Sequence, residues 1–275
     1  MLFVPGNQQR MLDKARTLAA DAVVLDLEDG VPAAAKEEAR RLVSAASAAS
    51  FRARVIVRIN GLAVGCLAED VAAALACQAT AVLLPKAGRS ADVQELADRL
   101  PRAVGIIPSV ETARGILHAE QIAQADSRVE ALAFGPEDFA RDLGVERTRD
   151  GAERMQALGL MVLAARSAGV LALDGPYGDF ADAAGLEADC LRARRIGVKG
   201  KFAIHPGQLD TINRAFAPTA DELEWARRAV ELFEGGARQG RGAVALDGQM
   251  IDEPVYRRAT DLLSWGVLSR FQSSP

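Results

Sequence analysis

The chain has 275 residues, of which 49% are hydrophobic and 25% are charged, values that are typical of a globular enzyme. Its 37 acidic and 33 basic residues give a formal net charge of −4, and the absence of a dense lysine and arginine block argues against a nucleic-acid partner. The longest apolar runs fall short of the ~20 residues of a membrane helix, and the first residues lack the basic region of a signal peptide. We therefore expect a cytoplasmic protein without membrane contacts.

Eight short apolar runs recur along the first 205 residues, and each is followed by a polar residue or a turn. The runs are rich in valine, isoleucine, leucine or alanine without strict alternation, which is typical of strands that are covered on both faces. The predicted strands span residues 2–5, 22–27, 54–59, 81–85, 103–110, 129–134, 170–174 and 201–205.

Alanine- and leucine-rich segments with charges at helical spacing lie between these strands. The predicted helices include residues 33–50, 66–79, 90–100, 153–168 and 182–196. Repeated β-then-α units predict a (β/α)8 TIM barrel over residues 1–216. A doubly wound open sheet is the alternative, but its phosphate-binding GxGxxG motif is missing.

The segment 217–275 has a different pattern. Thr219 is the expected cap of a helix with an acidic first turn, which we expect to end at Gly235-Gly236. A short hairpin and a last helix are predicted to follow. We interpret residues 217–275 as a C-terminal extension, a lid or an oligomer contact, rather than as an independent domain.

Polar residues follow the predicted strands, and in a barrel the carboxyl ends of the strands meet at one rim. A single acid after a strand can cap the next helix, and this reading suffices for Asp29 or Glu137 taken alone. It does not account for a ring of acids that also contains Arg58, Lys86 and His205. The residues at these ends are Asn7, Asp26, Glu28, Asp29, Arg58, Asn60, Lys86, Ser109, Glu111, Glu137, Asp138, Asp174 and His205.

The acid-rich ring, with almost no histidine or cysteine, favours a hard cation such as Mg²⁺ or Mn²⁺. Glu111 and Asp138 follow consecutive strands and are the predicted metal ligands. Arg58 would face them, and its guanidinium group can bind a substrate carboxylate with two hydrogen bonds. Gly135 and Pro136 form a turn that lets a substrate come close. This pattern predicts a site for a small 2-oxo or 2-hydroxy acid.

Lys86 at the end of the fourth predicted strand has two readings. A Schiff-base lysine needs a desolvated site that lowers its pKa. The acids Glu28 and Asp29 on the same rim would keep Lys86 protonated, which favours an ion pair. We interpret His205 as a residue that positions a loop, because a Pro-Gly pair follows it, and His118 as structural.

A set of motifs occurs in order along nearly the whole chain: LFVPGN, VLDLEDGV, VRIN, LLPK, IIPSVETARG, FGPEDF, LALDGP, IHPGQ and GQMIDEP. Together they resemble the citrate lyase beta-subunit-like family of the HpcH/HpaI aldolase superfamily, which is related to malyl-CoA and citramalyl-CoA lyases. The resemblance implies a (β/α)8 barrel, a homotrimer and Mg²⁺ at the mouth. It also implies cleavage or formation of a carbon–carbon bond between an acyl thioester and a 2-oxo acid.

The resemblance also implies roles for single residues. Glu111 of the VET motif and Asp138 of the GPED motif would bind the metal, and Arg58 of VRIN would bind the substrate carboxylate. Asp252 of GQMID would reach into a neighbouring subunit's site as an acid or base.

The acidic pair of the DLEDG motif, Glu28 and Asp29, would not bind the metal directly. These two residues would accept hydrogen bonds from water molecules on the metal and would hold Lys86 in place.

The expected activity is Mg²⁺-dependent cleavage of a coenzyme A thioester such as citramalyl-, malyl- or citryl-CoA into acetyl-CoA and a 2-oxo acid, or the reverse condensation. A class II pyruvate-type aldolase on free acids is one alternative, and a citrate lyase beta subunit acting on an acyl-carrier-protein thioester is another. A non-catalytic assembly protein is a third, and the intact set of Arg58, Glu111, Asp138 and Asp252 argues against it.

Overall fold

The computed structural model describes the backbone of residues 1–272 and the side chains of residues 1–265. The chain forms two compact units, one of residues 1–215 and one that begins at Phe216. The last three residues of the predicted extension, 273–275, lie outside the described residues. In the part of the chain that is described, no helix is both long and apolar enough to span a bilayer.

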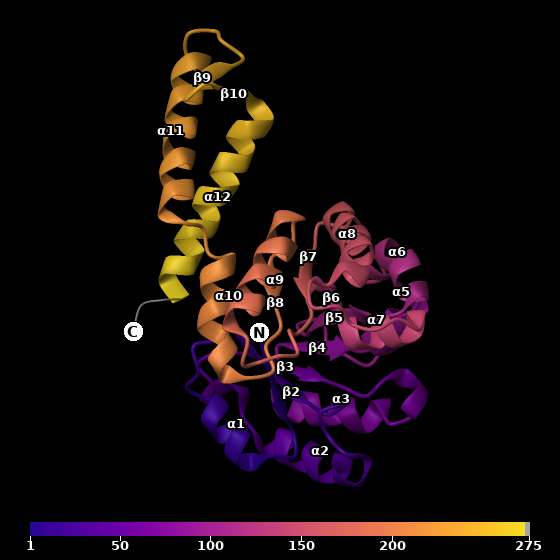
Figure 1. Cartoon of the computed structure of the whole chain (residues 1–275). Helices are drawn as coiled ribbons and strands as arrows, with labels where there is room; N and C mark the ends of the chain where they lie inside the picture. The colour runs from indigo at the N-terminus through magenta and orange to yellow at the C-terminus, as the bar shows by residue number, and fades with distance from the viewer. Residues whose placement is uncertain (273–275) are drawn as a thin grey trace. The chain divides into compact units, whose positions relative to one another are not determined.

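The first unit is built on a curled sheet of eight parallel strands that lie side by side in chain order (Figure 1). A doubly wound sheet would reverse its strand order at a switch point, so that alternative is wrong. The strands are β1 (Leu2–Pro5), β2 (Ala22–Asp26), β3 (Arg54–Arg58), β4 (Ala81–Leu84), β5 (Gly105–Val110), β6 (Ala131–Phe134), β7 (Leu171–Asp174) and β8 (Gly200–Lys201).

The eighth strand is much shorter than the predicted run of residues 201–205. Beyond it, Phe3 of β1 donates a backbone hydrogen bond of 2.9 Å to the carbonyl oxygen of Ala203. The amides of Ile204 and His205 donate instead to the side-chain oxygen of Gln208, at 2.9 and 3.2 Å. These two backbone amides therefore take no part in strand pairing, and β8 ends early.

Helices cover the outside of this sheet (Figure 1). They are α1 (Gln9–Ala15), α2 (Lys36–Ala45), α3 (Leu67–Ala76), α4 (Ser90–Ala97), α5 (Ala113–Leu117), α6 (Ala119–Ala123), α7 (Pro136–Leu143), α8 (Ala152–Ser167), α9 (Ala183–Arg195) and α10 (Leu209–Phe216). The predicted helix 33–50 is divided, because 3-10 turns at residues 33–35 and 48–50 flank α2. Since helices lie outside and other strands lie inside, a strand such as β2 is buried at every position.

The inside of the sheet holds one apolar cluster with members from all the strands from β2 to β7 and from the segment after β8. Its buried residues are Ala22, Val24, Ile56, Ala81, Leu83, Ile107, Ala131, Ala133, Leu173 and Phe202. Leu83, Ala133 and Phe202 also line a cavity at the carboxyl ends of the strands. The packed interior is therefore the floor of that cavity.

The second unit contains α11 (Ala220–Ala237), β9 (Val244–Leu246), β10 (Gln249–Ile251) and α12 (Glu253–Gln272). The predicted cap is confirmed, since Glu222 N–H donates to the Thr219 hydroxyl oxygen at 3.1 Å. The prediction that α11 ends at Gly235-Gly236 is wrong, because the helix continues to Ala237. A Cβ at Gly236 would overlap the side chain of Val244, so this glycine permits close packing of the hairpin rather than ending the helix.

Candidate functional site

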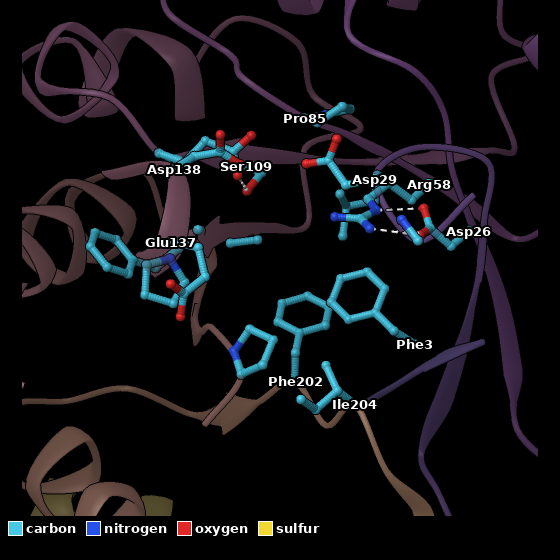
Figure 2. Close-up of a pocket in the computed structure, with 18 of the residues that line it drawn as sticks. Phe3, Asp26, Asp29, Arg58, Pro85, Ser109, Glu137, Asp138, Phe202 and Ile204 are labelled. Carbon is cyan, nitrogen blue, oxygen red and sulfur yellow. Dashed lines mark hydrogen bonds and ion pairs between the residues drawn. The ribbon is translucent and has the colours of Figure 1, made fainter. Parts of the chain in front are cut away.

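A cavity of about 350 Å³ opens at the carboxyl ends of the parallel strands, entirely within the first unit. One part of its wall is polar, and Figure 2 shows Asp26, Asp29, Arg58, Ser109 and Asp138 on that side. The other part is apolar, and the same view shows Phe3, Phe202 and Ile204 facing the polar groups (Figure 2). The predicted residues Arg58, Glu111, Gly135, Pro136 and Asp138 all line this one cavity.

Arg58, the last residue of β3, is held by acids from the end of β2. Its Nε and Nη2 donate to the two carboxylate oxygens of Asp26 at 2.6 and 2.7 Å, and its Nη1 lies 3.1 Å from Glu28. The guanidinium also lies 4.4 Å from the ring centroid of Phe3. Burial lowers the pKa of Arg58, but the hydrogen bonds and charge of Asp26 outweigh it, so the net pKa is raised. Arg58 is thus a fixed cation in the wall.

Lys86, just after β4, contacts both acids of the DLEDG motif. Its ammonium group donates to Glu28 and lies 3.4 Å from Asp29. Burial lowers the pKa of Lys86, but the Glu28 hydrogen bond and charge raise it further, and the net pKa is above its ordinary value. A Schiff-base lysine needs the opposite shift, so the ion-pair reading agrees with the geometry.

Glu111, after β5, is a buried carboxylate with a fixed orientation. Its Oε1 accepts the backbone N–H of Lys86 at 2.7 Å, and its Oε2 accepts the hydroxyl of Ser109 at 2.7 Å. Burial raises the pKa of Glu111 to about 7, and the charges of Asp138 and Glu28 raise it in the same direction. Glu111 and Asp138 both line the cavity, so their carboxylates are exposed to the same space.

Asp138 lies in the first turn of α7, which Pro136 starts at its first position. One oxygen of Asp138 accepts a hydrogen bond of 2.7 Å from Arg141, one turn later. Gly135 precedes the helix, and a Cβ at Gly135 would overlap the carboxylate of Glu111. Because Gly135 has no side chain, the start of α7 can lie close to Glu111. A larger residue at position 135 would prevent this close approach.

Within the described residues, no group of three or more acidic, histidine or cysteine side chains is arranged so that it could hold a metal ion. Glu111 and Asp138 supply two carboxylates, and a hexacoordinate Mg²⁺ takes its remaining ligands from water and substrate oxygens. The two acids fit that mode of binding.

Six residues of the predicted ring do not line the cavity: Asn7, Glu28, Asn60, Lys86, Asp174 and His205. The side chain of Asn60 donates a hydrogen bond of 2.7 Å to the buried Asp70. Asp174 of β7 forms an ion pair with Lys201 of β8. His205 accepts the N–H of Gly207 at 3.1 Å, which agrees with a loop-positioning role.

Asp252 lies in the second unit and caps α12, where its carboxylate accepts the N–H of Val255 at 3.2 Å. Sequence reasoning did not single out the apolar wall of Phe3, Phe202 and Ile204. The only signal in the sequence was that these residues belong to the same strands that carry the polar ends.

Parallel α/β strands in sequential order, with a carboxylate-rich cavity at their carboxyl ends, define a class of enzymes with catalytic loops on one face of the sheet. Residues 1–206 match the family model described as HpcH/HpaI aldolase/citrate lyase. The chain belongs to this family, as the motifs predicted.

Known relatives agree with this assignment. A (3S)-malyl-CoA thioesterase of Cereibacter sphaeroides (strain KD131) is 39% identical, with 92% of this chain and 88% of the relative covered. The citrate lyase subunit beta of Escherichia coli (strain K12) is 37% identical, with 98% and 93% covered. A crystal structure of protein CitE from Mycobacterium tuberculosis in complex with magnesium, acetoacetate and coenzyme A is 36% identical, covers 97% of both chains and has a TM-score of 0.82.

Proposed function

We propose that this protein is a Mg²⁺-dependent carbon–carbon lyase that cleaves a 3-hydroxyacyl thioester of coenzyme A into acetyl-CoA and a 2-oxo acid, or forms it by the reverse condensation. The observation that carries the proposal is that Glu111, Asp138 and Arg58 line the same cavity. Family membership and the relative solved with magnesium and coenzyme A support the choice of cofactor and thioester.

Glu111 and Asp138 would hold the cation, and their oxygen atoms suit Mg²⁺ or Mn²⁺. Burial, and after it the charges of Asp138 and Glu28, raise the pKa of Glu111, and a divalent cation would offset the repulsion between these carboxylates. Glu28 and Asp29, with Lys86, would support the surroundings of the cation. When bound, Mg²⁺ would lower the pKa of the substrate hydroxyl by its Lewis acidity.

Residues of this protein would bind the substrate and would transfer a proton to or from the thioester α-carbon. Arg58 would hold the substrate carboxylate, and the turn at Gly135 and Pro136 would leave room for the substrate beside Glu111. After the hydroxyl proton is lost and the carbon–carbon bond breaks, Asp252 of a neighbouring subunit would donate a proton to the thioester α-carbon. In the condensation direction the same carboxylate would remove that proton.

The assembly is also part of the proposal. The hydrogen bond from Phe3 to Ala203 supports a sheet that closes into a (β/α)8 barrel. The segment 217–275 would serve as a lid or oligomer contact in a cytoplasmic homotrimer, which is what would bring Asp252 to a neighbouring site.

The test is an assay of malyl-, citramalyl- and citryl-CoA with and without Mg²⁺, with all products identified. We expect acetyl-CoA and a 2-oxo acid, and we expect Glu111→Gln and Asp138→Asn each to lower kcat/KM by at least about 100-fold. Glu146→Gln, an exposed acid outside the cavity, is the matched control and should retain activity.

Other outcomes would reject the assignment as a lyase of coenzyme A thioesters. A free 3-hydroxy acid and coenzyme A without any 2-oxo acid would indicate a thioesterase, the activity in the name of one relative. Turnover of free aldol substrates alone would favour the class II aldolase, and a requirement for an acyl carrier protein would favour the citrate lyase subunit.

A further inference from the structure

Ser109 is a polar side chain on the inner face of β5. Ile107, two residues earlier on the same strand, belongs to the apolar cluster inside the sheet, and residues two apart on a strand point to the same face. Ser109 therefore also points to the inside, nearer the carboxyl end of the strand. Its exposure is 5%, and it lines the polar side of the cavity (Figure 2).

Packing at this position does not require a hydroxyl group. In the register of β5 and β6, Ser109 lies opposite Ala133, a member of the inner apolar cluster, so a methyl group suffices on the neighbouring strand. A hydroxyl that is removed from water is unfavourable unless it forms a hydrogen bond. The hydroxyl of Ser109 donates at 2.7 Å to Oε2 of Glu111, and this bond offsets the loss of hydration.

Three contacts fix the carboxylate of Glu111. Oε1 accepts the backbone N–H of Lys86 at 2.7 Å, and Oε2 accepts the hydroxyl of Ser109. Gly135 lies so close that a Cβ at this position would be 2.0 Å from Oε2. Lys86 and Gly135 contribute through their backbones, whereas Ser109 contributes through its side chain. Substitution of Ser109 therefore removes one of the three contacts and leaves the other two.

Asp138, the second proposed ligand of the cation, is held less firmly. One of its oxygens accepts a hydrogen bond of 2.7 Å from Arg141, whose side chain is 75% exposed. An ion pair with so exposed a partner contributes little free energy, so the carboxylate of Asp138 can adjust when a cation binds. The fixed part of the site is therefore Glu111.

Magnesium and calcium ions differ in what they require of a fixed carboxylate. Mg²⁺ requires near-ideal octahedral geometry at about 2.0–2.1 Å, whereas Ca²⁺ accepts variable arrangements of oxygen atoms at about 2.3–2.6 Å. The flexibility of the ligands is one of the properties that decide between the two cations. A Glu111 carboxylate that is held in one orientation favours the more demanding ion, Mg²⁺.

We propose that Ser109 is a positioning residue for the divalent cation: its hydroxyl holds the Glu111 carboxylate in one orientation, and this orientation gives the site its preference for Mg²⁺ over Ca²⁺. The inference rests on the proposed function, which assigns Glu111 to the cation. Ser109 acts through Glu111 and not as a ligand itself. This role accounts for a hydroxyl group inside the sheet that packing does not require.

Calorimetric titration of the full-length protein with Mg²⁺ and, separately, with Ca²⁺ tests this role without turnover. The titrations are made at pH 9, well above the pKa of about 7 of Glu111, so that protons do not compete with the cation. We expect Ser109→Ala to bind Mg²⁺ about 10–100-fold more weakly than the wild type. Binding of Ca²⁺ should weaken less, so that the ratio of Mg²⁺ to Ca²⁺ affinity falls by about tenfold.

Two further variants separate the hydroxyl group from other effects. Ser109→Thr keeps the hydroxyl, and because position 109 lines the cavity, its methyl group has room. This variant should recover most of the Mg²⁺ affinity. Ser167→Ala is the matched control, since the hydroxyl of Ser167 also donates to a glutamate, Glu120, at 2.5 Å, but outside the cavity. It should leave both affinities unchanged.

Several outcomes would overturn the inference. Equal Mg²⁺ affinity of Ser109→Ala and the wild type is one, and equal losses for Mg²⁺ and Ca²⁺ are another, because they indicate a general loss of structure. A loss in Ser109→Thr as large as in Ser109→Ala would show that the hydroxyl is not the cause.

The proposed function can fail separately. If Mg²⁺ binding depends on Ser109 as expected but no thioester is cleaved, the lyase assignment fails and the role of Ser109 stands. If thioesters are cleaved and Ser109→Ala binds Mg²⁺ normally, the lyase assignment stands and the role of Ser109 is rejected.

Discussion

The backbone N–H of Lys86 donates a hydrogen bond of 2.7 Å to Oε1 of Glu111, and Lys86 adopts the left-handed conformation, with φ 56°. A lysine in this conformation is unfavourable by roughly 1–2 kcal/mol. The strained residue lies at the end of β4, where its amide fixes the orientation of a buried carboxylate. The conformation of Lys86 is thus coupled to the geometry of the candidate metal site.

Substitutions at position 86 can separate this backbone effect from the ion pair. Lys86→Gly and Lys86→Val both remove the ammonium group, but only glycine adopts a positive φ without strain. We expect Lys86→Val to have a free energy of unfolding lower than that of Lys86→Gly by about 1–2 kcal/mol, measured by urea denaturation. If the valine variant is as stable as the glycine variant, the left-handed conformation does not persist in solution.

A second prediction concerns the close approach of Gly135 to Glu111. Gly135→Ala would push the Glu111 carboxylate from its position, because the new Cβ would overlap it. We expect a loss of about 1–3 kcal/mol in the free energy of unfolding from overpacking, together with a smaller rise in Tm on addition of Mg²⁺.

Gly159→Ala is the matched control for this change. Gly159 lies within α8, and a Cβ added at this position would meet no atom within 4 Å, so alanine should stabilise the helix by up to about 1 kcal/mol. An unchanged Mg²⁺ response in Gly135→Ala, alongside the expected gain in Gly159→Ala, would show that position 135 does not shape the metal site.

The proximity of Glu111 and Asp138 could be predicted from the sequence because both residues follow strands. β5 and β6 are parallel neighbours, with Val110 opposite Phe134, so the residues just beyond them must lie at the same edge of the sheet. This inference requires only the strand pattern and the rule that consecutive βα units are adjacent.

The pairing of Arg58 with Asp26, by contrast, could not be predicted. Several acids follow β2, and the choice of partner depends on side-chain rotamers rather than on spacing along the chain. The apolar wall was missed for a related reason. Every residue of β1 is apolar, so the sequence pattern does not tell whether Phe3 points to the inside or to the helices.

The pKa of Glu111 leads to a prediction for the pH dependence of stability without metal. The folded state raises this pKa from 4.5 to about 7, so the folded protein binds the proton more tightly than the unfolded chain. The stabilising contribution is fully present below about pH 4.5 and is lost as the pH rises to about 7, with a total on the order of 3 kcal/mol. Urea denaturation in EDTA between pH 4.5 and 8 measures this loss.

Glu111→Gln isolates the contribution of this carboxyl group from that of other titrating groups. The free energy of unfolding of the wild type, relative to that of Glu111→Gln, should fall as the pH rises in EDTA. Mg²⁺ should restore the wild type more at pH 8 than at pH 5, because it replaces the proton. Parallel curves for the two proteins in EDTA would mean that Glu111 ionises normally in the folded state.

The last prediction concerns a buried group of charged side chains that connects β7 and β8 to the helices α8 and α9. Lys201 lies 2.5 Å from Asp174 and 2.7 Å from Asp189, and Arg154 lies 2.5 Å from each of the same two acids. All four side chains are almost fully buried. Lys201→Met should lower the free energy of unfolding by about 3–5 kcal/mol, because it leaves Asp174 with Arg154 alone and Asp189 with Arg154 and a 3.2 Å contact from the partly exposed Arg192. Lys14→Met, an exposed lysine on α1, should change it by less than about 0.5 kcal/mol.

The double variant Lys201→Met with Asp189→Leu shows whether the cost arises from unpaired charge or from lost packing. It leaves the pair of Arg154 and Asp174 intact, so it should recover a large part of the stability lost in Lys201→Met alone. Additive losses in the double variant would instead mean that Lys201 and Asp189 stabilise the fold independently. Since Phe202 follows Lys201 directly and lines the cavity, the same variants report whether this ion-pair cluster also holds the apolar wall in place, through the affinity for pyruvate.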